Sequence, residues 1–147
     1  MRIKDALGAA ATAAALTAAT VALAPGAAGV PGNALTLDQT GAIDHDGTIT
    51  LTGTYRCAVP RGSGTVFIGS NVVANGRSDG IGGSTATCDG RTHRWRNTAR
   101  PHEVTYRPGP VRADAVLMQI RRDRGGIPLP RFLSVAGVRT ITLVARP

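Results

Sequence analysis

Two cysteines, three histidines and a few serines are the residues of this chain that could do chemistry. The histidines His45, His93 and His102 could ligate a metal, but no two of them share one element at a ligand spacing. The glycine-flanked serines lack the Gly-x-Ser-x-Gly context that presents a nucleophile on a sharp turn. The sequence therefore predicts no catalytic residue, no metal site and no cofactor.

Acidic and glycine-rich segments could support other chemistry, but they too lack the required pattern. Asp44 and Asp46 precede Gly47 as in part of a calcium loop, yet the further oxygen ligands and the terminal glutamate are missing. Glu103 has no carboxylate partner for glycoside hydrolysis. Residues 80–83 are rich in glycine but precede no predicted helix, so they do not form a phosphate cradle. We expect Asp44, Asp46 and the glycine-rich residues 80–83 to lie in turns.

The first part of the chain has the composition of a secretory signal peptide. Arg2 and Lys4 precede an uncharged stretch, residues 6–24, and a proline and a glycine follow it. The stretch is mostly alanine, which gains little in lipid, and no positive residue follows it until Arg56. We therefore expect a helical signal peptide that is cleaved, no stable membrane anchor afterwards, and a secreted, extracellular protein.

Signal cleavage fixes the domain organisation. Small residues at the positions before the cut allow cleavage after Ala28 or after Ala34. Residues 1–34 are therefore predicted to be the signal peptide and residues 35–147 a single domain, which is long enough to bury a core of its own.

Export also determines the state of the cysteines. Cys57 and Cys88 are the only two in the chain, and extracellular proteins keep such pairs oxidised. The sequence therefore predicts one disulfide between them. A bond that closes a loop of this length stabilises a domain by roughly 3–4 kcal/mol on the chain-entropy model.

Basic charge is concentrated in the second half of the domain. Residues 35–88 contain three arginines and four acids, whereas residues 89–147 contain twelve arginines and four acids. A basic face suits an anionic cell-wall polymer or another extracellular protein, although solvated strand faces in an arginine-rich protein would give the same count. Few aromatic residues accompany the arginines, so specific nucleic-acid binding is not expected. The residues expected to contact an anionic surface are Arg94, Arg96, Arg121, Arg122 and Arg124.

Short alternating runs between Gly, Pro and Asp clusters predict an all-β domain. The clearest strand covers residues 48–57, where Ile49, Leu51, Tyr55 and Cys57 alternate with smaller or polar residues. Further strands are expected at residues 35–37, 65–73, 93–97, 113–120 and 138–144, and a short one ending at Cys88. In the strand at 93–97, Trp95 is expected to point inward and Arg94 and Arg96 outward. A mobile connection is expected at residues 74–83, a hairpin turn at 89–90 and a charged turn at 121–126. About seven such strands predict an immunoglobulin-like antiparallel β-sandwich, with a closed barrel as the alternative.

Two runs of sequence resemble a family of small secreted actinobacterial proteins catalogued as a domain of unknown function. They are DGTITLTGTYRC at residues 46–57 and CDGRTHRW at residues 88–95. The resemblance implies an immunoglobulin-like sandwich in which Cys57 and Cys88 are bonded. It implies no activity, ligand or functional residue.

Three classes of function remain open from the sequence. The first is a non-enzymatic extracellular binding or accessory module, because no catalytic set is visible and sandwiches commonly bind through loops and open faces. The second is a small-molecule carrier, which needs a pocket lined by Trp95, or a protease inhibitor, which needs an exposed loop such as 60–64 or 128–132. The third is an uncharacterised hydrolase, which needs a convergent His-Asp-Ser cluster.

Overall fold

The structure is a computed structural model that describes residues 32–147, which form eight β-strands and no helix. The strands are β1 (Ala34–Leu35), β2 (Thr40–Ile43), β3 (Ile49–Ala58), β4 (Thr65–Ala74), β5 (Arg77–Thr85), β6 (Asp89–Ala99), β7 (Gly109–Arg122) and β8 (Pro128–Ala145). Within these residues nothing helical is available to span a membrane. Most of the predicted signal peptide lies outside the described residues.

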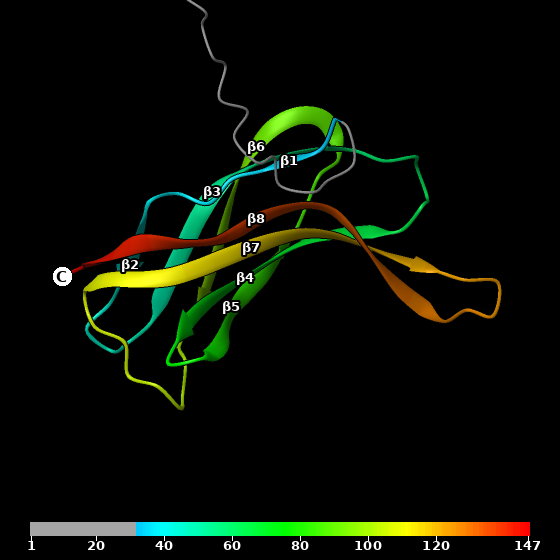
Figure 1. Ribbon diagram of the computed structural model, residues 1–147. Coiled ribbons are helices and arrows are strands. Elements are labelled where there is room, and N and C mark those ends of the chain that lie inside the picture. The colour runs from blue at the N-terminus through cyan, green and yellow to red at the C-terminus, as the bar shows by residue number, and fades with distance from the viewer. Residues whose placement is uncertain (1–31) are drawn as a thin grey trace, which may run out of the picture.

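The strands are arranged in two layers (Figure 1). In one layer β3 pairs with β6 on one side, and with β1 and then β2 along the other. In the second layer the order is β8-β7-β4-β5, with antiparallel neighbours throughout. Strand β2 joins the layers because it pairs antiparallel with β3 and parallel with β8.

This strand order confirms the predicted all-β, immunoglobulin-like sandwich. Strands β1, β3 and β6 occupy the places of A, B and E, and β8, β7, β4 and β5 those of G, F, C and C′. The disulfide differs from that of antibody domains, where the bridge joins strands B and F of opposite layers. Here Cys57 near the end of β3 is bonded to Cys88, directly before β6, so both cysteines belong to one layer.

The core lies between the layers and follows the predicted alternation. In β3, Ile49, Leu51, Tyr55 and Cys57 are buried, as expected for the inward positions of a strand. Trp95 on β6 is also buried, with 3% of its surface exposed, while its neighbours Arg94 and Arg96 face solvent.

The prediction of a mobile connection at residues 74–83 is wrong, because most of this segment is β5. Asn75 and Gly76 both have positive φ, at 51° and 75°, which is the geometry of a two-residue hairpin turn between β4 and β5. Ile81 is fully buried, and its neighbour Gly82 has no side chain because a Cβ there would lie 2.8 Å from the carbonyl oxygen of Thr98 on β6. Gly82 therefore allows β5 and β6 to approach closely.

Other boundaries also differ from those expected: β2 was not predicted, and β7 and β8 begin earlier in the chain than expected. Residues 86–88 are not a strand but cross from β5 to β6. Asp89 and Gly90 do not form a hairpin turn; they begin β6, where Asp89 pairs with Ala58 and Gly90 takes a φ of 79°. The Asp-Gly pair that suggested a turn lies beside an irregularity in the β3–β6 pairing, and Gly90 has its positive φ there.

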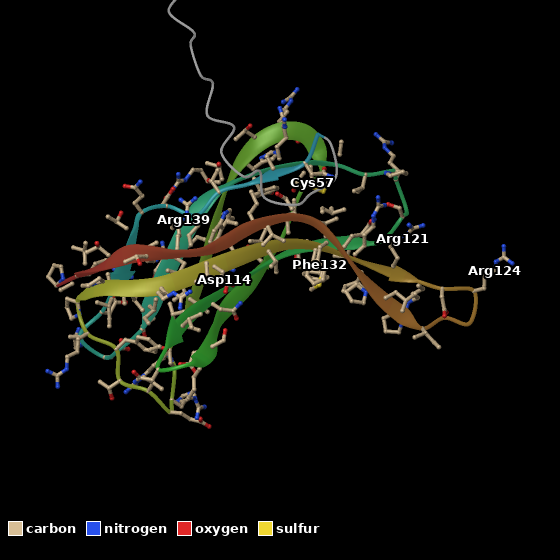
Figure 2. The ribbon with its side chains drawn as sticks, in the orientation of Figure 1. Cys57, Asp114, Arg121, Arg124, Phe132 and Arg139 are labelled. Carbon is tan, nitrogen blue, oxygen red and sulfur yellow. A yellow bond between two sulfur atoms is a disulfide. The ribbon has the colours of Figure 1, made fainter. Side chains whose placement is uncertain are left out.

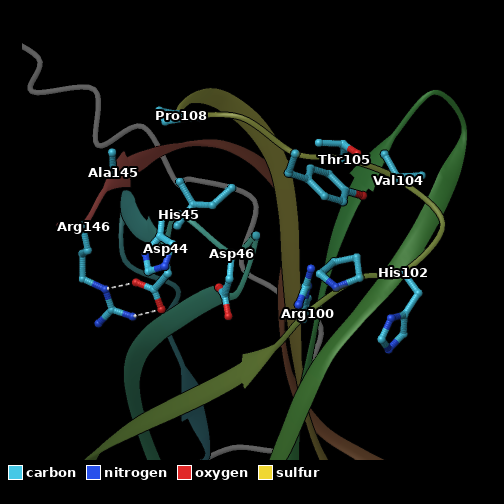
Figure 3. A pocket seen from close by; sticks show the side chains of 14 residues that line it. Asp44, His45, Asp46, Arg100, His102, Val104, Thr105, Pro108, Ala145 and Arg146 are labelled. Atoms are coloured by element: carbon cyan, nitrogen blue, oxygen red, sulfur yellow. Dashed lines mark hydrogen bonds and ion pairs between the residues drawn. The ribbon is translucent and has the colours of Figure 1, made fainter.

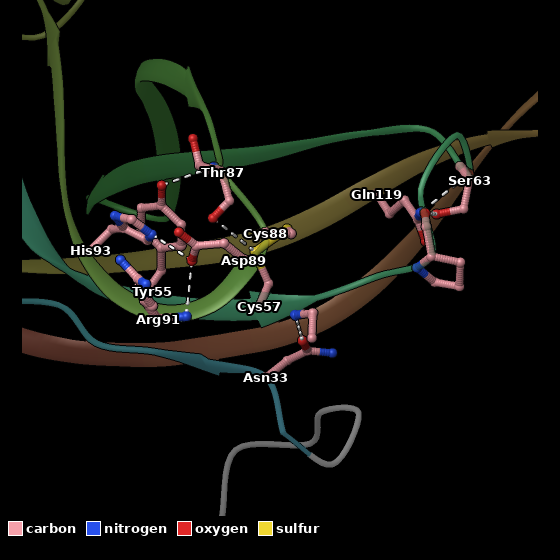
Figure 4. Close-up of a disulfide and its surroundings, with 12 residues drawn as sticks. Asn33, Tyr55, Cys57, Ser63, Thr87, Cys88, Asp89, Arg91, His93 and Gln119 are labelled. Atoms are coloured by element: carbon pink, nitrogen blue, oxygen red, sulfur yellow. Dashed lines mark hydrogen bonds and ion pairs between the residues drawn. A yellow bond between two sulfur atoms is a disulfide. The ribbon is translucent and has the colours of Figure 1, made fainter.

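The disulfide is surrounded by residues that connect β3 with the start of β6 (Figure 4). Tyr55 accepts a hydrogen bond from the backbone N–H of Thr87 at 3.0 Å, and its ring stacks on that of His93. The imidazole of His93 lies 2.8 Å from Asp89, and this hydrogen bond lowers the pKa of the Asp89 carboxyl below its ordinary value. These contacts hold the segment that crosses from β5 to β6 in place. The His93–Asp89 pair has no serine among these contacts, so they do not form the His-Asp-Ser cluster that a hydrolase would need.

Candidate functional site

The structure divides the five arginines predicted to contact an anionic surface into two groups. Arg94 and Arg96 lie on the outward face of β6, opposite Thr54 and Thr52 of β3. Arg121, Arg122 and Arg124 lie at the far end of β7 and in the turn that follows it (Figure 2). The five therefore do not form one surface.

In the β6 group, Arg94 already has an acidic partner on the surface of the protein. Arg94 donates to the carboxylate of Asp38 at 2.7 Å, and the hydroxyl of Thr52 donates to the same carboxylate at 2.7 Å. The hydrogen bond from Thr52, together with Arg94, keeps the pKa of Asp38 below its ordinary value. Asp38 therefore stays charged at neutral pH and offsets part of the charge on this face.

The second group lies on a two-stranded ribbon that extends beyond the sandwich. Strands β7 and β8 stay paired as far as Arg122 and Pro128, whereas β4 covers β7 only as far as Ile120. Beyond that point the β7–β8 hairpin has no neighbouring strand and projects from the body of the protein (Figure 1). The prediction that residues 128–132 form a loop is therefore wrong, because they are paired in β8.

The turn at the tip is closed by its only acid. The carboxylate of Asp123 accepts hydrogen bonds from the backbone N–H groups of Gly125, at 2.9 Å, and Ile127, at 2.8 Å. Arg122 donates to the carbonyl of Gly126 at 2.9 Å, and Gly126 has a φ of 80°. Asp123 is thus occupied by backbone groups and not by an arginine.

The loop at residues 60–64 lies beside this ribbon. The side-chain amide of Gln119 on β7, almost fully buried, donates to the carbonyl oxygen of Ser63 at 3.1 Å and to its hydroxyl at 2.7 Å. Gly64 packs on the backbone of Ile120 so closely that a Cβ would collide with it. Loop and ribbon together form what we call the hairpin end, residues 60–64 and 120–132.

The hairpin end carries a strong positive charge. It contains five arginines and one acid, Asp123. In the part of the chain that the structure describes, the ion pairs involve Arg77, Arg94, Arg146 and His93, and none of the arginines of the hairpin end. An anionic partner can therefore reach them without breaking an existing pair. The five are Arg61, Arg121, Arg122, Arg124 and Arg131.

Apolar side chains accompany these arginines. Ile127, Leu129 and Phe132 are 58%, 50% and 56% exposed. Phe132 lies opposite Met118 on β7, which in turn lies opposite Phe67 on β4, so an apolar row crosses these three strands at the base of the ribbon. Sequence reasoning missed Arg61, Arg131 and the apolar residues, although the Arg-rich turn beside Ile127 and Leu129 was a usable signal.

A hollow lies at another part of the fold, between the β2–β3 turn and the β6–β7 connection (Figure 3). Its volume is about 450 Å³, and it is lined by residues that include Asp44, His45, Asp46 and His102. The guanidinium of Arg146 holds Asp44 through two hydrogen bonds of 2.8 and 3.1 Å. No group of three His, Cys, Asp or Glu side chains suited to a metal occurs among residues 32–147.

A carrier would need a pocket lined by Trp95, and a hydrolase would need a cluster of His, Asp and Ser side chains. Trp95 is buried and lines neither the hollow nor the hairpin end. Among residues 32–147, the histidine that forms an ion pair is His93, which lies 2.8 Å from Asp89 beside the disulfide. The hairpin end is exposed and contains three prolines, Pro60, Pro128 and Pro130.

Comparisons with known proteins give a family but no activity. A model described as "Family of unknown function (DUF6299)" matches residues 31–146. No curated protein sequence matches the chain. Among solved structures, murine CRIg aligns over 78% of this chain and 98% of its own, with 12% sequence identity and a TM-score of 0.35.

Proposed function

The chain belongs to the family of unknown function DUF6299, and we propose that it is a secreted, non-enzymatic binding module that holds anionic extracellular surfaces through its hairpin end. The observation that carries this proposal is the cluster of five arginines without a paired carboxylate at the hairpin end, four of them on the β7–β8 hairpin and Arg61 on the loop beside it. Charge of one sign on a projecting element raises the local concentration of anionic partners and speeds their association. An anionic cell-wall polymer or an acidic extracellular protein would both meet this requirement.

A protease inhibitor is the second candidate, because one specific observation favours it. The proline-containing strand end at residues 128–132 is exposed and is held rigidly by pairing with β7. An inhibitor acts through such a rigid, preorganised segment. Inhibition of a trypsin-like protease by the intact protein, lost on substitution of Arg131, would support this candidate instead.

Removing charge from the hairpin end should weaken binding more than removing the same charge elsewhere. We expect Arg121→Gln/Arg124→Gln/Arg131→Gln to elute from a phosphate-bearing matrix at a clearly lower salt concentration than the unsubstituted protein, because bound charges of this kind are screened by salt. The matched control is Arg56→Gln/Arg94→Gln/Arg96→Gln, which removes three charges from the β3–β6 face. Equal elution of the two triple variants would mean that only net charge matters and would contradict the proposed site.

Secretion itself can be tested together with the cleavage position. Asn33 accepts a hydrogen bond from the backbone N–H of Ala58 at 3.0 Å, and Ala34 pairs with Arg56. Cleavage after Ala34 would remove both contacts from the end of β3 beside the disulfide, whereas cleavage after Ala28, which lies outside the described residues, would keep them. We therefore expect the intact mass of the exported protein to correspond to a chain that begins at Gly29. A chain that begins at Leu35, or keeps its first residues, would contradict this.

A further inference from the structure

We propose that the anionic surface bound by the hairpin end is a lipid bilayer, with Ile127, Leu129 and Phe132 entering the headgroup region. This inference rests on the proposed function and names the partner of the same site. It describes reversible association of a folded domain with a membrane surface and not a spanning segment.

The apolar residues of the tip are the first reason to favour lipid over a soluble polyanion. Ile127, Leu129 and Phe132 each leave about half or more of their surface in water. A hydrophilic polymer would leave these side chains as they are, whereas the boundary between headgroups and acyl chains would bury them. Ile127 and Leu129 lie on the projecting ribbon, and Phe132 lies at its base, opposite Met118 and on the other face from Leu129. A ribbon that enters the headgroup region end-on can bring both faces to this boundary without submerging the sandwich.

The arginines are placed to contact headgroups on both sides of the ribbon. Leu129 lies opposite Arg121, so these two share one face, and Arg131, opposite Gln119, lies on the same face. Arg122 lies opposite Pro128 on the other face. Basic residues at the rim of an apolar tip match an anionic leaflet, which attracts each cation that comes close to its surface.

The free edge of β8 is also suited to lipid and poorly suited to a protein strand. Pairing along an antiparallel ribbon alternates, and alternate residues direct their backbone groups away from the partner strand. Pro128 and Pro130, opposite Arg122 and Ile120, occupy alternate positions of this edge and have no N–H. The edge therefore exposes fewer unpaired donors to a low-dielectric environment and resists the addition of a strand from another protein.

The test is cosedimentation of the folded protein with vesicles of phosphatidylcholine alone and of phosphatidylcholine with phosphatidylglycerol. We expect binding only to the anionic vesicles, and a loss of at least about tenfold in partition coefficient for Ile127→Ser/Leu129→Ser/Phe132→Ser, because each truncation removes apolar burial of the order of one tenfold step. Val144→Ser, an equally exposed position far from the tip, is the control and should bind as the unsubstituted protein does. A Phe132→Trp variant should gain a blue-shifted emission component on binding.

The outcomes separate this inference from the proposed function. If the serine variant and the unsubstituted protein bind anionic vesicles equally, contact is electrostatic only and insertion is wrong. If the phosphate-bearing matrix retains the protein but vesicles do not, the lipid inference fails and the binding module stands. Failure to bind either would contradict both. Binding to an acidic protein that needs the three apolar side chains, without vesicle binding, would assign the hairpin end to a protein partner instead.

Discussion

Replacing Trp95 with alanine should lower the free energy of unfolding by about 3–5 kcal/mol, as is usual for large aromatic residues in cores. The indole lies opposite Gly53 of β3, and its N–H donates to the carbonyl oxygen of Thr36 at 2.9 Å. Gly53 gives the ring its space, because a Cβ there would lie 2.6 Å from the indole nitrogen. Truncation would therefore create a cavity in the core and leave the Thr36 carbonyl without this donor.

Chemical denaturation of the variant and of the control Arg96→Ala measures this effect. Arg96 is the next outward residue of β6, and its truncation should change stability by no more than about 0.5 kcal/mol. Trp95 is the only tryptophan in the chain, so its emission can be assigned directly in the unsubstituted protein. Red-shifted emission that iodide quenches readily would contradict its burial.

Removing the disulfide is the second change with a large expected effect. Cys57 and Cys88 are separated by 31 positions in sequence, and opening that loop with Cys57→Ala/Cys88→Ala should cost roughly 3–4 kcal/mol. Alanine is chosen because Cys57 is fully buried and a serine hydroxyl there would need a new hydrogen-bond partner. Melting temperatures of the variant, and of the unsubstituted protein before and after reduction, measure the loss.

Thiol titration gives an independent check on the same bond. The unfolded, unreduced protein should contain no titratable thiol, since both cysteines are paired in the structure. Two free thiols, or a dimer that reduction dissolves, would contradict the intramolecular disulfide.

The sequence predicted the parts of the fold that depend on local alternation. The inward residues of β3, such as Leu51 and Tyr55, and the burial of Trp95 follow from a period of two residues. Strand β5 was missed because its only large apolar residue is Ile81 and its glycines suggest a loop. The Asn75-Gly76 pair was the signal that could have corrected this, since both residues suit positive φ in a tight hairpin.

The candidate site could be predicted only in part. The arginines of the β7–β8 turn were identified from charge, and loops at 60–64 and 128–132 were each considered for binding. That the two segments form one end of the molecule depends on contacts such as that between Gln119 and Ser63, which are 56 positions apart. Composition and periodicity contain no information on such pairings, so the division of the five predicted arginines between β6 and the hairpin end could not be foreseen.

Residue-by-residue mapping of the bound surface would show whether the hairpin end is the binding site. Isotope-labelled protein would be titrated with a short soluble polyphosphate at low salt, and backbone amide shifts would be followed by nuclear magnetic resonance. The largest shifts should fall on the amides of residues 60–64 and 120–132, and added salt should reverse them. Shifts concentrated around Arg94 and Arg96, or in the hollow near Asp44, would contradict the assignment of binding to the hairpin end.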